Sequence, residues 1–101
     1  MTMKKNEVMD TLRDYTRFIK REIDTLPTTP EKIGIAIDVA IELLKKRNCL
    51  TTDDRIVRLF LVEHLTDLNK WRRGVGSMEP STPFASYIAI QKAIEVLNAA
   101  E

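Results

Sequence analysis

Residues 35–44 of this chain read Ile-Ala-Ile-Asp-Val-Ala-Ile-Glu-Leu-Leu, and residues 88–97 read Ile-Ala-Ile-Gln-Lys-Ala-Ile-Glu-Val-Leu. Seven of these ten positions are identical at an offset of 53 residues. Each stretch also follows a Thr-Pro pair, at residues 29–30 and 82–83. The two copies decide the fold, because each predicts a strongly apolar helix that other helices must cover.

The repeat extends toward the N-terminus in the same register and without a gap. Chance explains the Ile, Ala and Leu matches between two apolar helices, but it explains prolines and acids in one register less well. We therefore predict a duplication of two helical hairpins, residues 6–48 and 59–99, arranged with pseudo-twofold symmetry. Identical pairs outside the apolar copies are Leu12/Leu65, Asp14/Asp67 and Pro27/Pro80.

The whole chain predicts an all-α, four-helix domain, because apolar residues recur at steps of three or four in four segments. Pro27 ends the first segment, and Thr28 with Glu31 predicts a capping box at the start of the second. The run Thr51-Thr52-Asp53-Asp54 predicts an N-cap with first-turn acids for the third helix, and Gly74 predicts its end. The predicted helices cover residues 6–25, 31–48, 53–73 and 82–99.

Composition limits the function classes. The 101 residues suit one domain, residues 1–101, and the net charge of +1 excludes a globally basic nucleic-acid binder. The single cysteine, Cys49, cannot form an internal disulfide, and we find neither a leader peptide nor an apolar run that spans a bilayer. We therefore expect a cytoplasmic protein with no membrane partner.

We expect no enzyme activity, no cofactor and no metal. His64 is the only histidine, so a Cys/His metal cluster cannot form within one chain. Its spacing from Leu61 and Leu68 puts it on the apolar face of its helix, which predicts a partly buried, hydrogen-bonded structural histidine. Cys49 is interpreted as a small buried apolar residue.

A partner-binding function has more support. The helix over residues 31–48 is apolar nearly all round, which is more than a four-helix monomer of this size needs to bury. We therefore predict a small regulatory or inhibitory protein that binds a protein partner or a second copy of itself. The predicted interface residues are Ile33, Ile35, Val39 and Leu43.

Helix-turn-helix DNA binding is the alternative function. Residues 68–74, Leu-Asn-Lys-Trp-Arg-Arg-Gly, with Pro80-Ser81 after them, resemble the recognition-helix end of phage-repressor-type domains. The resemblance covers residues 54–74 and implies a scaffold helix at 54–61, a turn at 62–64 and a recognition helix at 65–73 that binds duplex DNA. It implies base contacts from Leu65, Thr66, Asp67 and Lys70, and phosphate contacts from Asn69, Arg72 and Arg73.

The duplication argues against this alternative, because residues 59–73 align without a gap on residues 6–20, which form one unbroken helix pattern. The cations at the helix ends are also explained by the helix dipole alone. An acidic partner or phosphate backbone remains the other interpretation of the basic patch. The residues of that patch are Thr66, Asn69, Lys70, Arg72 and Arg73.

Overall fold

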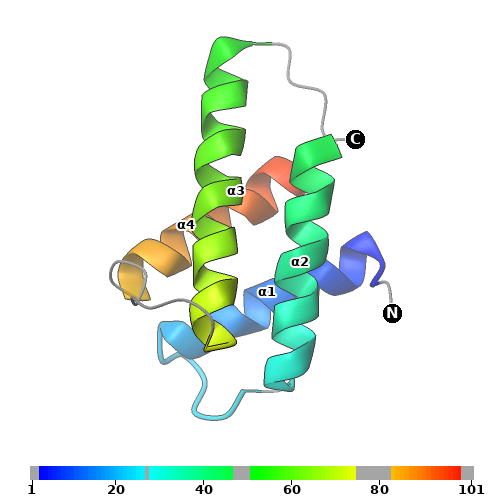
Figure 1. Cartoon of the computed structure of the whole chain (residues 1–101). Coiled ribbons are helices and arrows are strands. Elements are labelled where there is room, and N and C mark those ends of the chain that lie inside the picture. Colours follow the sequence, from blue (N-terminus) through cyan, green and yellow to red (C-terminus); the bar gives the residue numbers. More distant parts are fainter. Residues whose placement is uncertain (1–2, 27, 47–50, 75–82, 99–101) are drawn as a thin grey trace.

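The computed structural model describes residues 3–26, 28–46, 51–74 and 83–98, and among these residues it contains four α-helices and no strand. α2 and α3 lie alongside each other, and α1 and α4 cross behind them (Figure 1). The predicted all-α, four-helix fold is therefore confirmed. The helices are α1 (Lys5–Ile19), α2 (Pro30–Lys46), α3 (Thr52–Arg72) and α4 (Pro83–Asn98).

The core forms where α2 packs against the other three helices, while α3 packs against α2 and α4. Its members are apolar side chains spaced three and four residues apart, so each helix contributes one continuous buried face. Several core positions 53 residues apart are buried in both halves, as a duplication would give; the duplication itself stays a prediction. Buried pairs at this offset are Val8/Leu61, Leu12/Leu65, Ala36/Ala89, Ile37/Ile90, Ala40/Ala93 and Leu44/Leu97.

The first helix is shorter than predicted. α1 ends at Ile19 and not near residue 25, because Arg21 adopts a left-handed backbone with a φ of 61°. The Arg21 N–H donates to the Phe18 carbonyl, and the next N–H donates to the Arg17 carbonyl. This is the Schellman pattern of hydrogen bonds that closes a helix. Gly74, 53 residues later, ends α3 with a φ of 73°, as predicted.

The N-cap predicted for α3 is observed, whereas α2 is capped by a different threonine from the one predicted. The Thr51 hydroxyl accepts a hydrogen bond from the Asp54 N–H at 3.0 Å, so the predicted cap of α3 is confirmed. At α2 the capping threonine is Thr29, which accepts from the Lys32 N–H at 3.2 Å, and not Thr28. Predictions for Cys49, the loop at 75–80 and residues 47–48, 82 and 99 fall outside the described residues.

α3 is uninterrupted over Thr52–Arg72. The turn at 62–64 that a helix-turn-helix requires is therefore not formed, and this part of the alternative is wrong. Leu65, expected from the resemblance to face DNA bases, is fully buried in the core. The apolar stripe through Leu61, Leu65 and Leu68 keeps one helical period, so the chain has no local reason to break there.

Candidate partner-binding surface

The outer face of α3 carries three large apolar side chains. Ile56, Leu59 and Phe60 are 60%, 59% and 59% exposed. They are neighbours on one side of the helix because they are spaced three and four residues apart. Scattered exposed apolar residues are ordinary on a protein surface, but a contiguous group is typical of an interaction site. We name these three residues the α3 apolar face.

Charged side chains surround the α3 apolar face. Glu63 and Asp67 are exposed and follow Ile56 and Phe60 at helical spacing, so they continue the same side of the helix toward its C-terminus. Arg55, also exposed, lies at the N-terminal end. The surface is therefore apolar in the first half of α3 and acidic in the next turns, and its N-terminal end carries the exposed acids Asp53 and Asp54 beside Arg55.

Asn69 is an internal anchor and not a surface contact. It is 3% exposed, and its Nδ2 donates to Asp38 Oδ1 at 2.8 Å and to the Gly34 carbonyl at 3.2 Å. Arg73 Nη2 lies 2.6 Å from the other oxygen of Asp38. These bonds join α3 to α2, so the predicted role of Asn69 as a nucleic-acid or acidic-partner contact is wrong.

The other members of the predicted basic patch have different environments. Arg72 donates to the Pro30 carbonyl at 3.2 Å, and its guanidinium lies 5.2 Å from the centre of the Tyr15 ring. The Thr66 hydroxyl donates to the Val62 carbonyl at 2.6 Å, within its own helix. Lys70 is exposed. The five residues therefore do not present one shared cationic surface.

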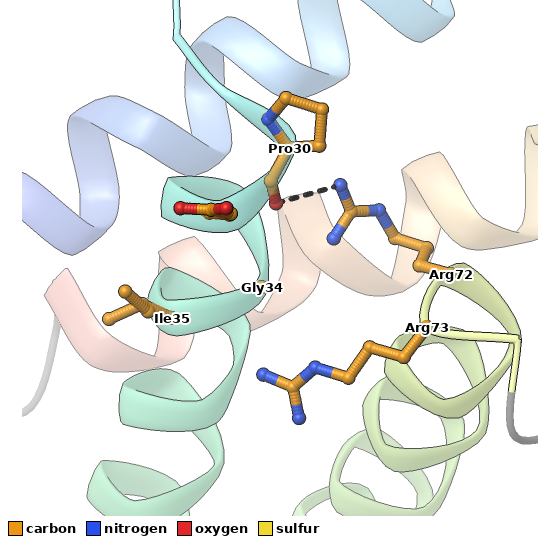
Figure 2. Close-up of a pocket in the computed structure, with 6 residues that line it drawn as sticks. Pro30, Gly34, Ile35, Arg72 and Arg73 are labelled. Carbon is orange, nitrogen blue, oxygen red and sulfur yellow. Dashed lines mark hydrogen bonds between the residues drawn. The ribbon is translucent and has the colours of Figure 1, made fainter.

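Arg72 and Arg73 line a cavity between the start of α2 and the end of α3. Its volume is about 410 Å³, and Pro30, Gly34 and Ile35 form the α2 side together with Glu31. Figure 2 shows both arginines extending from α3 toward α2, with the Arg72 bond to the Pro30 carbonyl at one end.

The structure corrects one residue of the interface predicted on α2. Ile33 is fully buried in the core and is not available to a partner. Ile35, Val39 and Leu43 are half-buried. Val39 and Leu43 line a cavity of about 340 Å³ together with Met3, between charged side chains, so they keep some contact with the surface.

The sequence analysis missed the α3 apolar face, although the sequence contains a signal for it. Residues 59–62, Leu-Phe-Leu-Val, are four consecutive large apolar residues. Four consecutive helical positions point in four directions about 100° apart, so one narrow core cannot bury them all. Leu61 is buried, whereas Leu59 and Phe60 are exposed.

His64 is partly buried, as predicted, but its predicted hydrogen bonding is not complete. Its Nε2 atom is buried and has no hydrogen-bond partner among the described residues. The Phe60 ring lies 6.0 Å away between centroids and is tilted by 35°. In the described part of the chain no three His, Cys, Asp or Glu side chains form a group that could hold a metal ion.

Comparisons with protein-family models, with curated proteins and with solved structures find no match for this chain. Among the described residues, no helix is both long enough and apolar enough to cross a membrane.

Proposed function

We propose that the protein is a non-catalytic regulatory protein that works by binding another protein through the α3 apolar face. The observation that carries this proposal is the exposure of Ile56, Leu59 and Phe60, three large apolar side chains on one side of a helix. Leaving such a group in water is unfavourable, and docking a second apolar surface on it removes that cost.

The partner that this surface fits is a second copy of the chain. If two α3 helices pack in antiparallel orientation around Leu59 and Phe60, the two apolar faces cover each other. The same pairing brings Arg55 of each copy opposite the segment of the other copy that carries Glu63 and Asp67. Arg55 then attracts these acids whereas the neighbouring exposed Asp53 and Asp54 repel them, so the clearest electrostatic attraction is that between the antiparallel helix dipoles.

The expected association is weak. Burying the exposed part of each of the three side chains is worth roughly 1–2 kcal/mol, or about 6–12 kcal/mol for the two copies together. Association costs about 4–15 kcal/mol in lost freedom of motion. At the lower limit of that cost the surplus is about 2–8 kcal/mol, so we expect a weak dimer with a dissociation constant in the micromolar to millimolar range.

Sedimentation equilibrium over that concentration range tests the proposal. We expect the wild-type chain to dimerise reversibly and the double variant Leu59→Ser, Phe60→Ser to stay monomeric. Ile88→Ser is the matched control, because Ile88 is an exposed apolar residue on α4 (48% exposed). It should dimerise like wild type. A wild-type chain that is monomeric at every concentration, or a control variant that alone loses the dimer, would refute the second copy as the partner.

Binding to duplex DNA has less support. The structure gives α3 no turn at 62–64, and Arg72 and Arg73 already bond to Pro30 and Asp38. A phosphate backbone binds cations that are not already paired within the protein. These internal bonds therefore weaken the interpretation of residues 66–73 as a DNA contact. We expect no shift of duplex DNA on a native gel even at low salt.

A further inference from the structure

The cavity between α2 and α3 has a counterpart in the other half of the chain. At the offset of 53 residues, Gly34 corresponds to Tyr87 and Arg73 to Lys20. The start of α2 and the end of α3 thus correspond to the start of α4 and the end of α1, and both pairs of helices are in contact. The two places can therefore be compared residue by residue.

In the α1–α4 half, the ring of Tyr87 occupies the position that corresponds to Gly34. The Lys20 ammonium lies 4.8 Å from the centre of the Tyr87 ring, within the range of a cation–π interaction. The same Nζ atom lies 2.9 Å from Glu22 Oε2, so the cation is held over the ring by a carboxylate. The Glu22 carboxylate and the Tyr87 hydroxyl both raise the pKa of Lys20, which keeps it charged.

In the α2–α3 half the position that corresponds to Tyr87 has no ring, and two arginines are present; the Arg72 guanidinium lies over the Tyr15 ring, whereas Arg73 has no ring contact among the described residues. Gly34 has no side chain, and a Cβ atom built there would lie 3.3 Å from Arg73 Nη2 and 3.7 Å from Arg72 Nη1. Asp38 holds the Arg73 guanidinium at 2.6 Å, in the way that Glu22 holds Lys20. The space of about 410 Å³ beside Gly34 therefore offers, at Arg73, the cationic side of a cation–π site without its ring.

We propose that this cavity binds an aromatic ring, which enters beside Gly34 and stacks against the guanidinium group of Arg73, while Arg72, which already contacts the Tyr15 ring, lines the cavity beside it. Hydrogen bonds to Pro30 and Asp38 use the edges of these guanidiniums, and a planar guanidinium offers its face to a ring at the same time. Ile35 provides an apolar wall.

The charge and size of the cavity fit a neutral ring. Glu31 and Asp38, the ion-pair partner of Arg73, offset the charges of the two guanidiniums, so the cavity has no large net charge to attract an anion. Its volume of about 410 Å³ exceeds the roughly 150 Å³ that is enough to hold benzene in an apolar cavity. An aryl ring is the chemistry of a tyrosine or phenylalanine side chain and of a small phenol alike. This cavity is separate from the α3 apolar face, so the proposal for one surface can be refuted while the proposal for the other stands.

Amide NMR of the full chain, titrated with p-cresol and with N-acetyl-tyrosinamide, tests the proposal. We expect saturable shifts at Gly34, Ile35, Arg72 and Arg73 with both probes and none with N-acetyl-leucinamide, which has an aliphatic side chain and no ring. Tighter binding of the tyrosine amide than of p-cresol assigns the site to a polypeptide ligand, and the reverse assigns it to a small phenol.

Two variants check the location. Gly34→Tyr copies the residue of the other half and should abolish the shifts, while Arg73→Met should weaken binding about two- to fivefold through the lost cation. The Cβ atom that Gly34→Tyr introduces requires a few tenths of an ångström of movement from the flexible end of Arg73, and the ring requires more. If the Gly34→Tyr variant does not fold, the titration of the wild-type chain still tests whether the cavity binds a ring. No saturable shift with either aryl probe, equal shifts with the leucine amide, or shifts with inorganic phosphate alone would overturn the proposal.

Discussion

Two leucines on α3 provide a matched test of how this helix is oriented. Leu65 is fully buried in the core, whereas Leu59 is 59% exposed on the outer face. Both are internal to the same helix, so the intrinsic helix preference of a Leu→Ala change is the same at the two positions. The difference between the two variants therefore measures burial.

We expect Leu65→Ala to lower the free energy of unfolding by about 3–4 kcal/mol, because it removes buried methyl groups and leaves a cavity. Leu59→Ala should cost less than about 1 kcal/mol, because over half of the side chain is already in water. A domain of this length has a total stability of roughly 5–15 kcal/mol, so both variants should still fold.

Urea denaturation followed by circular dichroism at low protein concentration measures both values without a contribution from self-association. With a slope near 1.5 kcal/mol per molar urea, the Leu65 variant should unfold roughly 2 M earlier than wild type. Equal costs at the two positions would refute the orientation of α3. A larger cost at Leu59 would favour the helix-turn-helix arrangement, in which residue 65 faces outward.

Three further predictions concern helix ends and charged contacts. Arg21 and Gly74 both have a left-handed backbone, which favours glycine over other residues. Arg21→Gly should therefore stabilise the protein by about 0.5–1 kcal/mol, and Gly74→Ala should destabilise it by about 1 kcal/mol. Thermal unfolding measures both changes. Asp38→Ala should cost roughly 1–2 kcal/mol in urea, because Asn69 and Arg73 lose their shared acceptor. The hydrogen bond from Lys20 lowers the pKa of Glu22, so the stability from this pair is present above pH 4.5 and is lost as the pH falls through the lowered value. The stability difference between wild type and Glu22→Gln should therefore shrink toward zero in acid, and a difference that persists there would contradict the assignment.

The sequence predicted the helices well where it contains a local signal. Gly74 marks the end of α3 in the sequence, since a left-handed backbone favours glycine. The corresponding position in the first half is Arg21, which adopts the same backbone without that signal. The apolar spacing continues through Ile23 and Leu26, so the pattern predicted a helix that runs six residues too far.

The surface was harder to predict than the core, because apolar periodicity does not say which neighbours cover a helix. α2 packs against three helices, so its apolar residues on several sides are buried or half-buried, as Ile33 and Val39 show. α3 packs against two, and this leaves Leu59 and Phe60 exposed. The difference depends on tertiary arrangement and not on local sequence.

The role of Asn69 was unpredictable for a similar reason. Its partners, Gly34 and Asp38, lie 35 and 31 positions earlier on another helix. A polar residue near several cations resembles a phosphate contact when only its neighbours in sequence are considered. Its burial and its two hydrogen bonds to α2 become evident only when the helices are packed together.

The central claim is that the α3 apolar face is the surface that binds a partner. Amide NMR of the wild-type chain over a dilution series from millimolar to micromolar concentration tests it most directly. The account predicts concentration-dependent shifts at Ile56, Leu59 and Phe60 that follow one dissociation constant, with Ile88 on α4 unchanged. Spectra that do not change with concentration, or shifts gathered around Ile88 in place of α3, would contradict it.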